Sequence, residues 1–146
     1  MSNKEILGYI RLENKDIDAN DIIQLENIGA DGVFLADDSM PLDEERLIKL
    51  IKAVNEKSDM PLIVKRHYQR LEDVKKILYA GDTRVAMDVM SAADFRLMSE
   101  VSDRFGKENG AALLAPYFSD VAWRAYKDAL EVTQAEPLIE YVLSCH

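Results

Sequence analysis

Residues 28–36 read IGADGVFLA, and this stretch decides the class of fold. Gly29 is placed to end a helix, because glycine adopts the left-handed conformation common after a last helical turn. The run at residues 32–36 is short and apolar, as strands buried on both faces are. A second joint between a predicted helix and a predicted strand, with the sequence GDTRV, occupies residues 81–85. Two strand–helix units fill the interval, as duplication of a two-unit block predicts.

On both sides of this stretch, further apolar runs predict strands at residues 5–12, 61–65, 84–88 and 111–115. The segments between them are long enough for crossover helices, which indicates a parallel sheet. We expect the first helix to begin after Asp18 or Asn20 and to end at Gly29. A second helix is predicted with Pro41 near its start and Asp43, Glu44 and Glu45 in its first turn. A third carries Leu71, Val74, Ile77 and Leu78 and stops at Gly81. A fourth is capped by Ser91 and runs to Phe105, and two more are predicted at residues 119–133 and 137–143.

Composition limits the classes of function. The chain has 146 residues and a net charge of −9, so its field repels phosphate backbones and disfavours nucleic-acid binding. The single cysteine, Cys145, excludes a disulfide framework and a cysteine-based metal site within one chain. With two histidines and no glycine-rich nucleotide loop, we expect no metal and no cofactor. No apolar run is long enough for a membrane helix or a signal peptide, so we expect a cytoplasmic protein without membrane contact.

Five short segments between residues 21 and 105 resemble, in sequence and in order, segments of a known family. They are residues 28–35, 59–64, 71–81, 84–87 and 103–106. Together they are similar to the first half of the histidine-biosynthesis (βα)8 barrels. That family comprises the phosphoribosylformimino-aminoimidazole carboxamide ribotide isomerase and the cyclase subunit of imidazole glycerol phosphate synthase. The resemblance implies a ribulose-phosphate-binding barrel made of βα units.

The positions to which the resemblance assigns function depart from the family's pattern. Arg11 stands where the family has an acid/base aspartate at the end of the first strand, and a guanidinium does not take up a proton. The family's glycines after the third strand are replaced by residues 65–68, KRHY, which removes a backbone cradle for phosphate. Asp88 stands near the fourth strand's end, where it would repel phosphate. The isomerase or cyclase chemistry is therefore expected to be lost.

Two sets of candidate site residues remain. Lys65, Arg66 and His67 follow the third strand and, with the helix start at Ser91, form a candidate phosphate site; the alternative is a solvated loop paired with nearby acids. Glu13, Asp37 and Asp88 are the weak candidates for acid/base groups. Asp37, Asp38 and Asp88 could also form a carboxylate site for Mg²⁺. Asp37 and Asp38 could instead be a phospho-acceptor pair like that of response-regulator receivers. A role as helix caps and turn residues explains these aspartates more simply.

Five strands are too few for a closed barrel. We therefore expect a single α/β domain over residues 1–146, with half-barrel-like βα units at residues 1–115 and a helical tail at residues 116–146. The sheet is either a half-barrel or an open, flavodoxin-like sheet, and the tail favours the open sheet with self-association. The leading hypothesis is a degenerate binding or assembly domain, a homo-oligomer with residual phosphosugar affinity or a histidine-pathway protein partner. The rival is an active isomerase or cyclase whose barrel is completed by oligomerisation.

Overall fold

The computed structural model describes residues 6–13, 16–89, 91–106 and 110–114, with side chains as far as residue 106. In this part of the chain five strands alternate with four helices. The strands are β1 (Leu7–Arg11), β2 (Gly32–Ala36), β3 (Leu62–Lys65), β4 (Thr83–Val89) and β5 (Gly110–Leu114). The helices are α1 (Ala19–Asn27), α2 (Glu44–Lys57), α3 (Leu71–Leu78) and α4 (Ala92–Phe105). The two helices expected after residue 115 lie outside the described residues.

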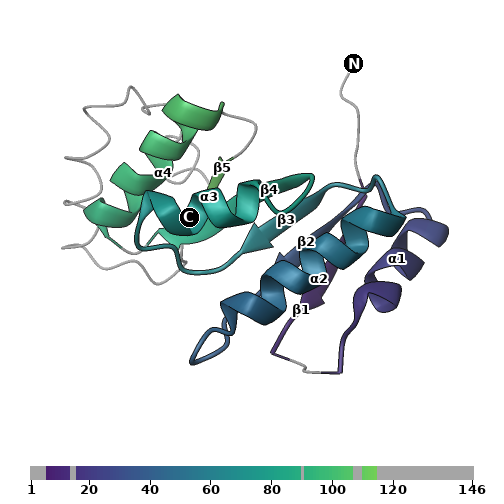
Figure 1. The fold of residues 1–146 in the computed structure, drawn as a ribbon. Helices are drawn as coiled ribbons and strands as arrows, with labels where there is room; N and C mark the ends of the chain where they lie inside the picture. Colours follow the sequence, from purple (N-terminus) through teal and green to yellow (C-terminus); the bar gives the residue numbers. More distant parts are fainter. Residues whose placement is uncertain (1–5, 14–15, 90, 107–109, 115–146) are drawn as a thin grey trace, which may run out of the picture.

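All five strands are parallel and follow one another in the order β1-β2-β3-β4-β5. Right-handed crossovers between successive strands place every helix on one side of such a sheet. Figure 1 shows α1 to α4 on that common side. A flavodoxin-like sheet has its first strand inside the order and helices on both faces, so that alternative is wrong and the described part is half-barrel-like.

The side chains of the strands alternate between the two faces of the sheet. Val33, Leu35, Val64 and Val85 are fully buried against the helices. The other face, which we call the inner face because a closed barrel would enclose it, is only partly covered. On β1 its residues Leu7 and Tyr9 are 42% and 62% exposed.

The helix boundaries follow local capping chemistry. Asp18 caps α1 in a capping box with Asp21, and Gly29 follows its end at φ 105°. Ser91 accepts a hydrogen bond from the backbone N of Asp94 and caps α4, and Gly106 follows at φ 94°. These predicted boundaries are confirmed.

Two predicted boundaries are wrong in detail. Asp43 is the N-cap of α2 rather than part of its first turn, so Pro41 precedes the helix. Helix α3 ends at Leu78 and does not reach Gly81. An added Cβ at Gly81 would come within 3.1 Å of the Asn55 side chain, so this glycine permits close approach to α2 instead of ending a helix.

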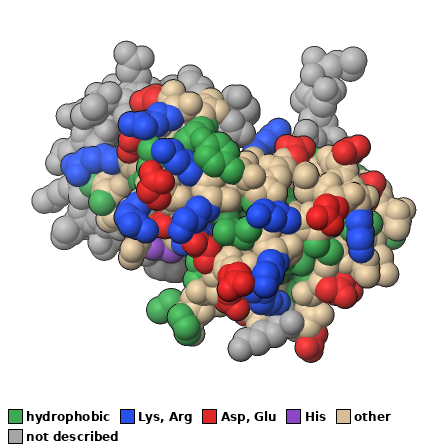
Figure 2. Space-filling view, viewed as in Figure 1, with side chains coloured by type: hydrophobic (Ala, Val, Ile, Leu, Met, Phe, Trp, Pro, Cys, Tyr) green, Lys and Arg blue, Asp and Glu red, His purple; other side chains and the backbone are tan. Residues whose placement is uncertain are grey.

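The surface over the helices carries mixed charge. Figure 2 shows acidic and basic side chains interspersed across this face. Exposed pairs one turn apart, such as Glu45 with Lys49 and Glu100 with Arg104, contribute to this pattern. No helix among the described residues is long and apolar enough to cross a membrane.

Candidate functional site

The carboxyl ends of parallel strands form one rim, where α/β proteins of this kind bind ligands. Alternation divides this rim into two groups of side chains. Arg11 and Lys65 each pair with Ala36, and Asp88 lies two residues after Ala86, the partner of Lys65, so all three lie on the inner-face side. Asp37 and Arg66 each follow a strand by one residue and therefore lie on the helix side.

On the inner-face side the charges neutralise one another. The Lys65 ammonium lies 3.2 Å from Asp38 Oδ1 and 2.9 Å from Asp88 Oδ2. Burial alone would lower the pKa of Lys65, but the hydrogen bonds to Asp88 and Asp38 outweigh it and hold that pKa above its usual range. Asp88 lies within β4, which continues one residue beyond the predicted end to Val89. Lys65 is thus the centre of a three-residue cluster with two carboxylates.

At the end of β1, Arg11 Nε lies 3.5 Å from Glu13 Oε2. The other Glu13 oxygen accepts a hydrogen bond from the backbone N of Asp38 at 2.9 Å. The hydrogen bond from its own backbone N–H, followed by those of Asp38 and Arg11, lowers the pKa of Glu13 despite burial. A carboxylate with a lowered pKa is a weaker base, which makes Glu13 less suited to proton abstraction.

On the helix side, Arg66 is 7% exposed and held from several directions. Its Nη1 donates to Glu44 Oε2 at 3.0 Å, its Nε donates to the carbonyl of His67 at 3.2 Å, and its guanidinium lies 4.9 Å from the centre of the Tyr68 ring. Burial alone would raise the pKa of Glu44, but the hydrogen bonds from Arg66 and Lys76 lower it overall. Arg66 therefore forms a buried ion pair that ties β3 to the start of α2.

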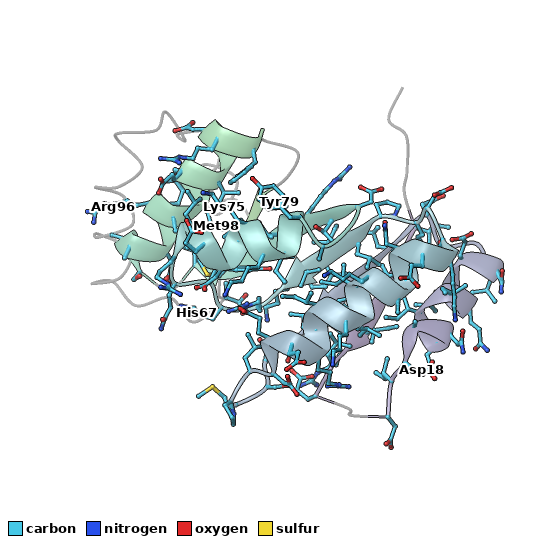
Figure 3. All side chains as sticks on the ribbon, viewed as in Figure 1. Asp18, His67, Lys75, Tyr79, Arg96 and Met98 are labelled. Carbon is cyan, nitrogen blue, oxygen red and sulfur yellow. The ribbon has the colours of Figure 1, made fainter. Side chains whose placement is uncertain are left out.

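The remaining predicted site residues are spread along the rim. Asp37 is 5% exposed and accepts a hydrogen bond from the backbone N of Ser39 at 3.1 Å. The His67 side chain is 58% exposed and lies 3.4 Å from Asp94 Oδ1, and Figure 3 shows it at the end of α3 nearest the rim. Ser91 is occupied as the cap of α4. The described residues hold no group of three His, Cys, Asp or Glu placed to bind a metal.

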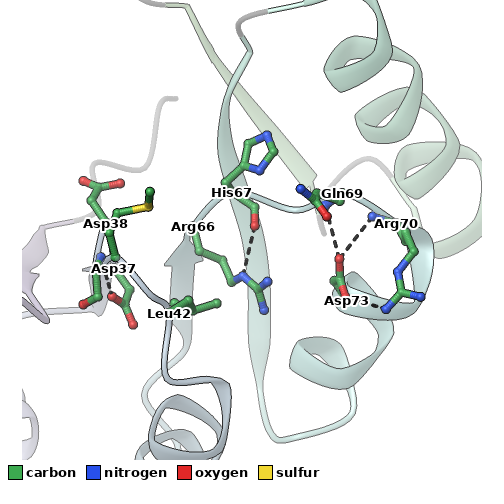
Figure 4. A pocket seen from close by; sticks show the side chains of 10 residues that line it. Asp37, Asp38, Leu42, Arg66, His67, Gln69, Arg70 and Asp73 are labelled. Atoms are coloured by element: carbon green, nitrogen blue, oxygen red, sulfur yellow. Dashed lines mark hydrogen bonds and ion pairs between the residues drawn. The ribbon is translucent and has the colours of Figure 1, made fainter.

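A pocket of about 430 Å³ lies on the helix side of the rim, between the segment that joins β2 to α2 and the segment that joins β3 to α3. Asp37, Arg66 and His67 line it together with Arg70 and Asp73 (Figure 4). The structure therefore brings Asp37 and Arg66 to one pocket. It places Lys65 and Asp88 in a separate cluster and Glu13 with Arg11.

Sequence reasoning missed Glu44, Tyr68 and Asp73 as parts of this region. Glu44 was interpreted only as a first-turn acid of a helix. The alternation of side chains along β3 could have revealed this contact. Leu62 and Val64 face the helices, and Arg66, two residues after Val64, is expected to face the same way. A charged residue at a helix-facing position needs an opposite charge beside it, and Glu44 at the start of α2 supplies that charge.

Asp73 should make the protein more stable at neutral pH than in acid. Burial alone would raise its pKa, but hydrogen bonds from the backbone N of Gln69 and of Arg70 hold that pKa below the ordinary 3.8. A lowered native pKa gives stability that is present above about pH 4 and is lost as pH falls through the native value. We expect the stability difference between wild type and Asp73→Asn to shrink between about pH 5 and pH 2 in urea unfolding. Glu45→Gln, on the exposed face of α2, is the control, and a pH-independent difference would contradict the assignment.

The fold and the rim define a class: a half-barrel-like α/β domain with its candidate ligand sites at the carboxyl ends of the strands. Within that class the chain resembles the cyclase subunit of imidazole glycerol phosphate synthase, HisF. It is 32% identical over 96 residues to HisF of Microcystis aeruginosa, covering 62% of this chain and 38% of that protein. With HisF of Trichormus variabilis it is 33% identical over 96 residues, covering 62% and 37%. No family model matches.

The chain thus spans less than two fifths of the length of the curated relatives that it matches. The relationship to a histidine-biosynthesis barrel, expected from the sequence, is confirmed as a partial resemblance. The sequential parallel sheet agrees with it, because a barrel is built from strands in that order.

Proposed function

We propose that this chain is a degenerate relative of the histidine-biosynthesis barrels, which acts as a binding or assembly domain without isomerase or cyclase activity. The observation that carries this proposal is the Arg11–Glu13 pair at the end of β1. An always-charged guanidinium occupies the place of an acid/base group, and it neutralises the nearest carboxylate. The rest of the inner rim supports the same conclusion, since Lys65 is neutralised by Asp38 and Asp88.

The inner face supports assembly with a second copy of the chain. Tyr9 stacks on Phe34 with ring centres 5.6 Å apart, yet Tyr9 remains 62% exposed. Leu7, 42% exposed, extends this apolar surface along β1. Among the described residues β1 pairs with β2 alone, so its other edge has free backbone groups. Apolar surface beside a free strand edge is typical of an interface.

Phosphosugar binding at Lys65, Arg66, His67 and Ser91 is a weaker part of the proposal. A phosphate would have to compete with Asp38 and Asp88 for Lys65, and with Glu44 for Arg66. His67 is the most exposed of the three side chains at residues 65–67, and its neighbours are already paired, so any affinity is expected to be low. A partner from the histidine pathway, which the relationship to HisF supports, is the other candidate for the binding role.

Sedimentation velocity tests the assembly role. We expect the wild-type protein to sediment as a dimer or larger species. Tyr9→Asp places a charge in the apolar surface and should weaken association by about tenfold or more, because a buried unpaired charge costs more than 1.4 kcal/mol. Tyr79→Asp is the matched control: Tyr79 is 74% exposed at the end of α3, on the helix side (Figure 3).

A monomeric wild-type protein, or equal dissociation in both variants, would contradict assembly through this face. Turnover assays with the phosphoribosyl substrates of the isomerase and the cyclase test the other half of the proposal. We expect no turnover. Activity that is lost in Glu13→Gln would instead favour the enzyme whose barrel is completed by oligomerisation.

A further inference from the structure

The pocket on the helix side shares Asp38 with the cluster around Lys65, while Lys65 and Asp88 themselves do not line it. It measures about 430 Å³, within the range of small-molecule sites. Its walls include the two segments after β2 and β3, and its lining includes three charged residues that are more than nine-tenths buried, Asp37, Arg66 and Asp73 (Figure 4). Buried charges of both signs at one pocket call for an explanation beyond turn formation.

Asp37 has an oxygen that nothing in the described chain satisfies. Its Oδ1 accepts the hydrogen bond from Ser39, whereas Oδ2 has no hydrogen bond or ion pair among the described residues. Asp37 is 5% exposed as a residue and lines the pocket, and its Oδ2 is not among the buried side-chain atoms without a partner, so this oxygen is open to the pocket. The pocket is therefore where a cationic partner for Oδ2 would be received.

Arg66 supplies the opposite group in a fixed orientation. Nη1 and Nε are engaged by Glu44 and the carbonyl of His67, while Nη2 has no hydrogen-bond partner among the described residues. Glu44 pairs with Arg66 at 3.0 Å and also with Lys76 at 3.1 Å. The free Nη2 can orient a carboxylate by a hydrogen bond.

Ion pairs engage most of the charges around the pocket. Arg70 Nη2 lies 3.5 Å from Asp73 Oδ1, Glu44 pairs with both Arg66 and Lys76, and Asp38 shares Lys65 with Asp88. Asp37 has no ion-pair partner among the described residues, which favours a ligand with a cationic group at that end.

The pairing of β2 with β3 brings Asp37 and Arg66 to one pocket. Ala36 pairs with Lys65, and the backbone N of Asp37 donates to the carbonyl of Lys65 at 2.8 Å. The chain positions of Asp37 and Arg66 are therefore neighbours across two strands about 4.8 Å apart. Both side chains line the pocket, so one small ligand that carries a cation and an anion can contact both.

We propose that this pocket binds a small zwitterion of the α-amino acid class, with its ammonium group on Asp37 and its carboxylate on the free Nη2 of Arg66. The site does not depend on the inner face, so it holds whether or not the chain assembles through Tyr9. It adds a ligand chemistry to the proposed binding role that phosphosugar recognition does not include.

Thermal unfolding with each proteinogenic L-amino acid at millimolar concentration tests the proposal, followed by calorimetric titration of the amino acid with the largest shift. We expect at least one amino acid to raise the melting temperature. Asp37→Asn should weaken its binding by about tenfold or more, because the amide keeps the acceptor for Ser39 but loses the charge. Glu45→Gln, which removes one charge from the exposed face of α2, should bind as the wild type does.

Further probes separate the two ends of the ligand. The matching amine without a carboxylate and the matching acid without an ammonium group should each bind at least about tenfold more weakly than the amino acid. The proposal is overturned if no amino acid shifts the melting temperature, or if the shift persists in Asp37→Asn. It is also overturned if inorganic phosphate binds the wild type more tightly than every amino acid. Unchanged amino-acid binding in Tyr9→Asp would separate this site from the assembly face.

Discussion

Arg66→Leu is expected to lower the free energy of unfolding by about 2–3 kcal/mol. Arg66 is 7% exposed, and leucine would remove its bonds to Glu44 and to the carbonyl of His67 as well as its contact with the Tyr68 ring. Glu44 would keep Lys76 at 3.1 Å, which is why we expect less than the full cost of an isolated buried charge. Urea unfolding monitored by circular dichroism measures the change.

A double-mutant cycle assigns this loss to the pair. The double variant Glu44→Gln, Arg66→Leu should lose less stability than the sum of the two single variants. The reason is that Arg66→Leu alone leaves the Glu44 carboxylate without this partner, and Glu44→Gln removes that carboxylate. Arg96→Leu is the matched control, since Arg96 points away from α4 into solvent (Figure 3) and should change stability by less than about 0.5 kcal/mol. Additive effects at positions 44 and 66 would contradict the buried ion pair.

The second large effect is expected in the core beneath α2. Ile51→Ala should destabilise the protein by about 2–5 kcal/mol, because it removes a fully buried side chain and leaves a cavity. Ile51 belongs to the stripe that α2 presents to the sheet, with Leu47, Leu50 and Val54. The midpoint of urea unfolding should fall while the slope of the transition stays unchanged.

A milder variant keeps this second prediction testable if Ile51→Ala does not fold. Ile51→Val should cost about 0.5–1.5 kcal/mol. Lys52→Ala, at the next and exposed position of α2, should stay within about 0.5 kcal/mol of the wild type. Equal losses at positions 51 and 52 would mean that α2 does not pack on the sheet by its apolar stripe.

The sequence alone determined the elements and their order. The joint at residues 28–36 became the end of α1 and strand β2, with Gly29 at positive φ, because helix stops and buried strands depend on local chemistry. The caps at Asp18 and Ser91 were predictable for the same reason. The resemblance to a histidine-biosynthesis barrel also came from the order of such joints, and the similarity to HisF confirms it.

The tertiary structure decided how the strands are ordered and which rim residues meet. Sequence reasoning left the half-barrel and the flavodoxin-like sheet open, because both use the same alternating elements and differ only in strand order. It also treated Lys65 and Arg66 as one phosphate site. In a strand, neighbouring side chains point to opposite faces, so Lys65 meets Asp38 and Asp88 while Arg66 meets Glu44. These partners lie more than twenty residues away in the sequence, and only the register of the sheet brings them together.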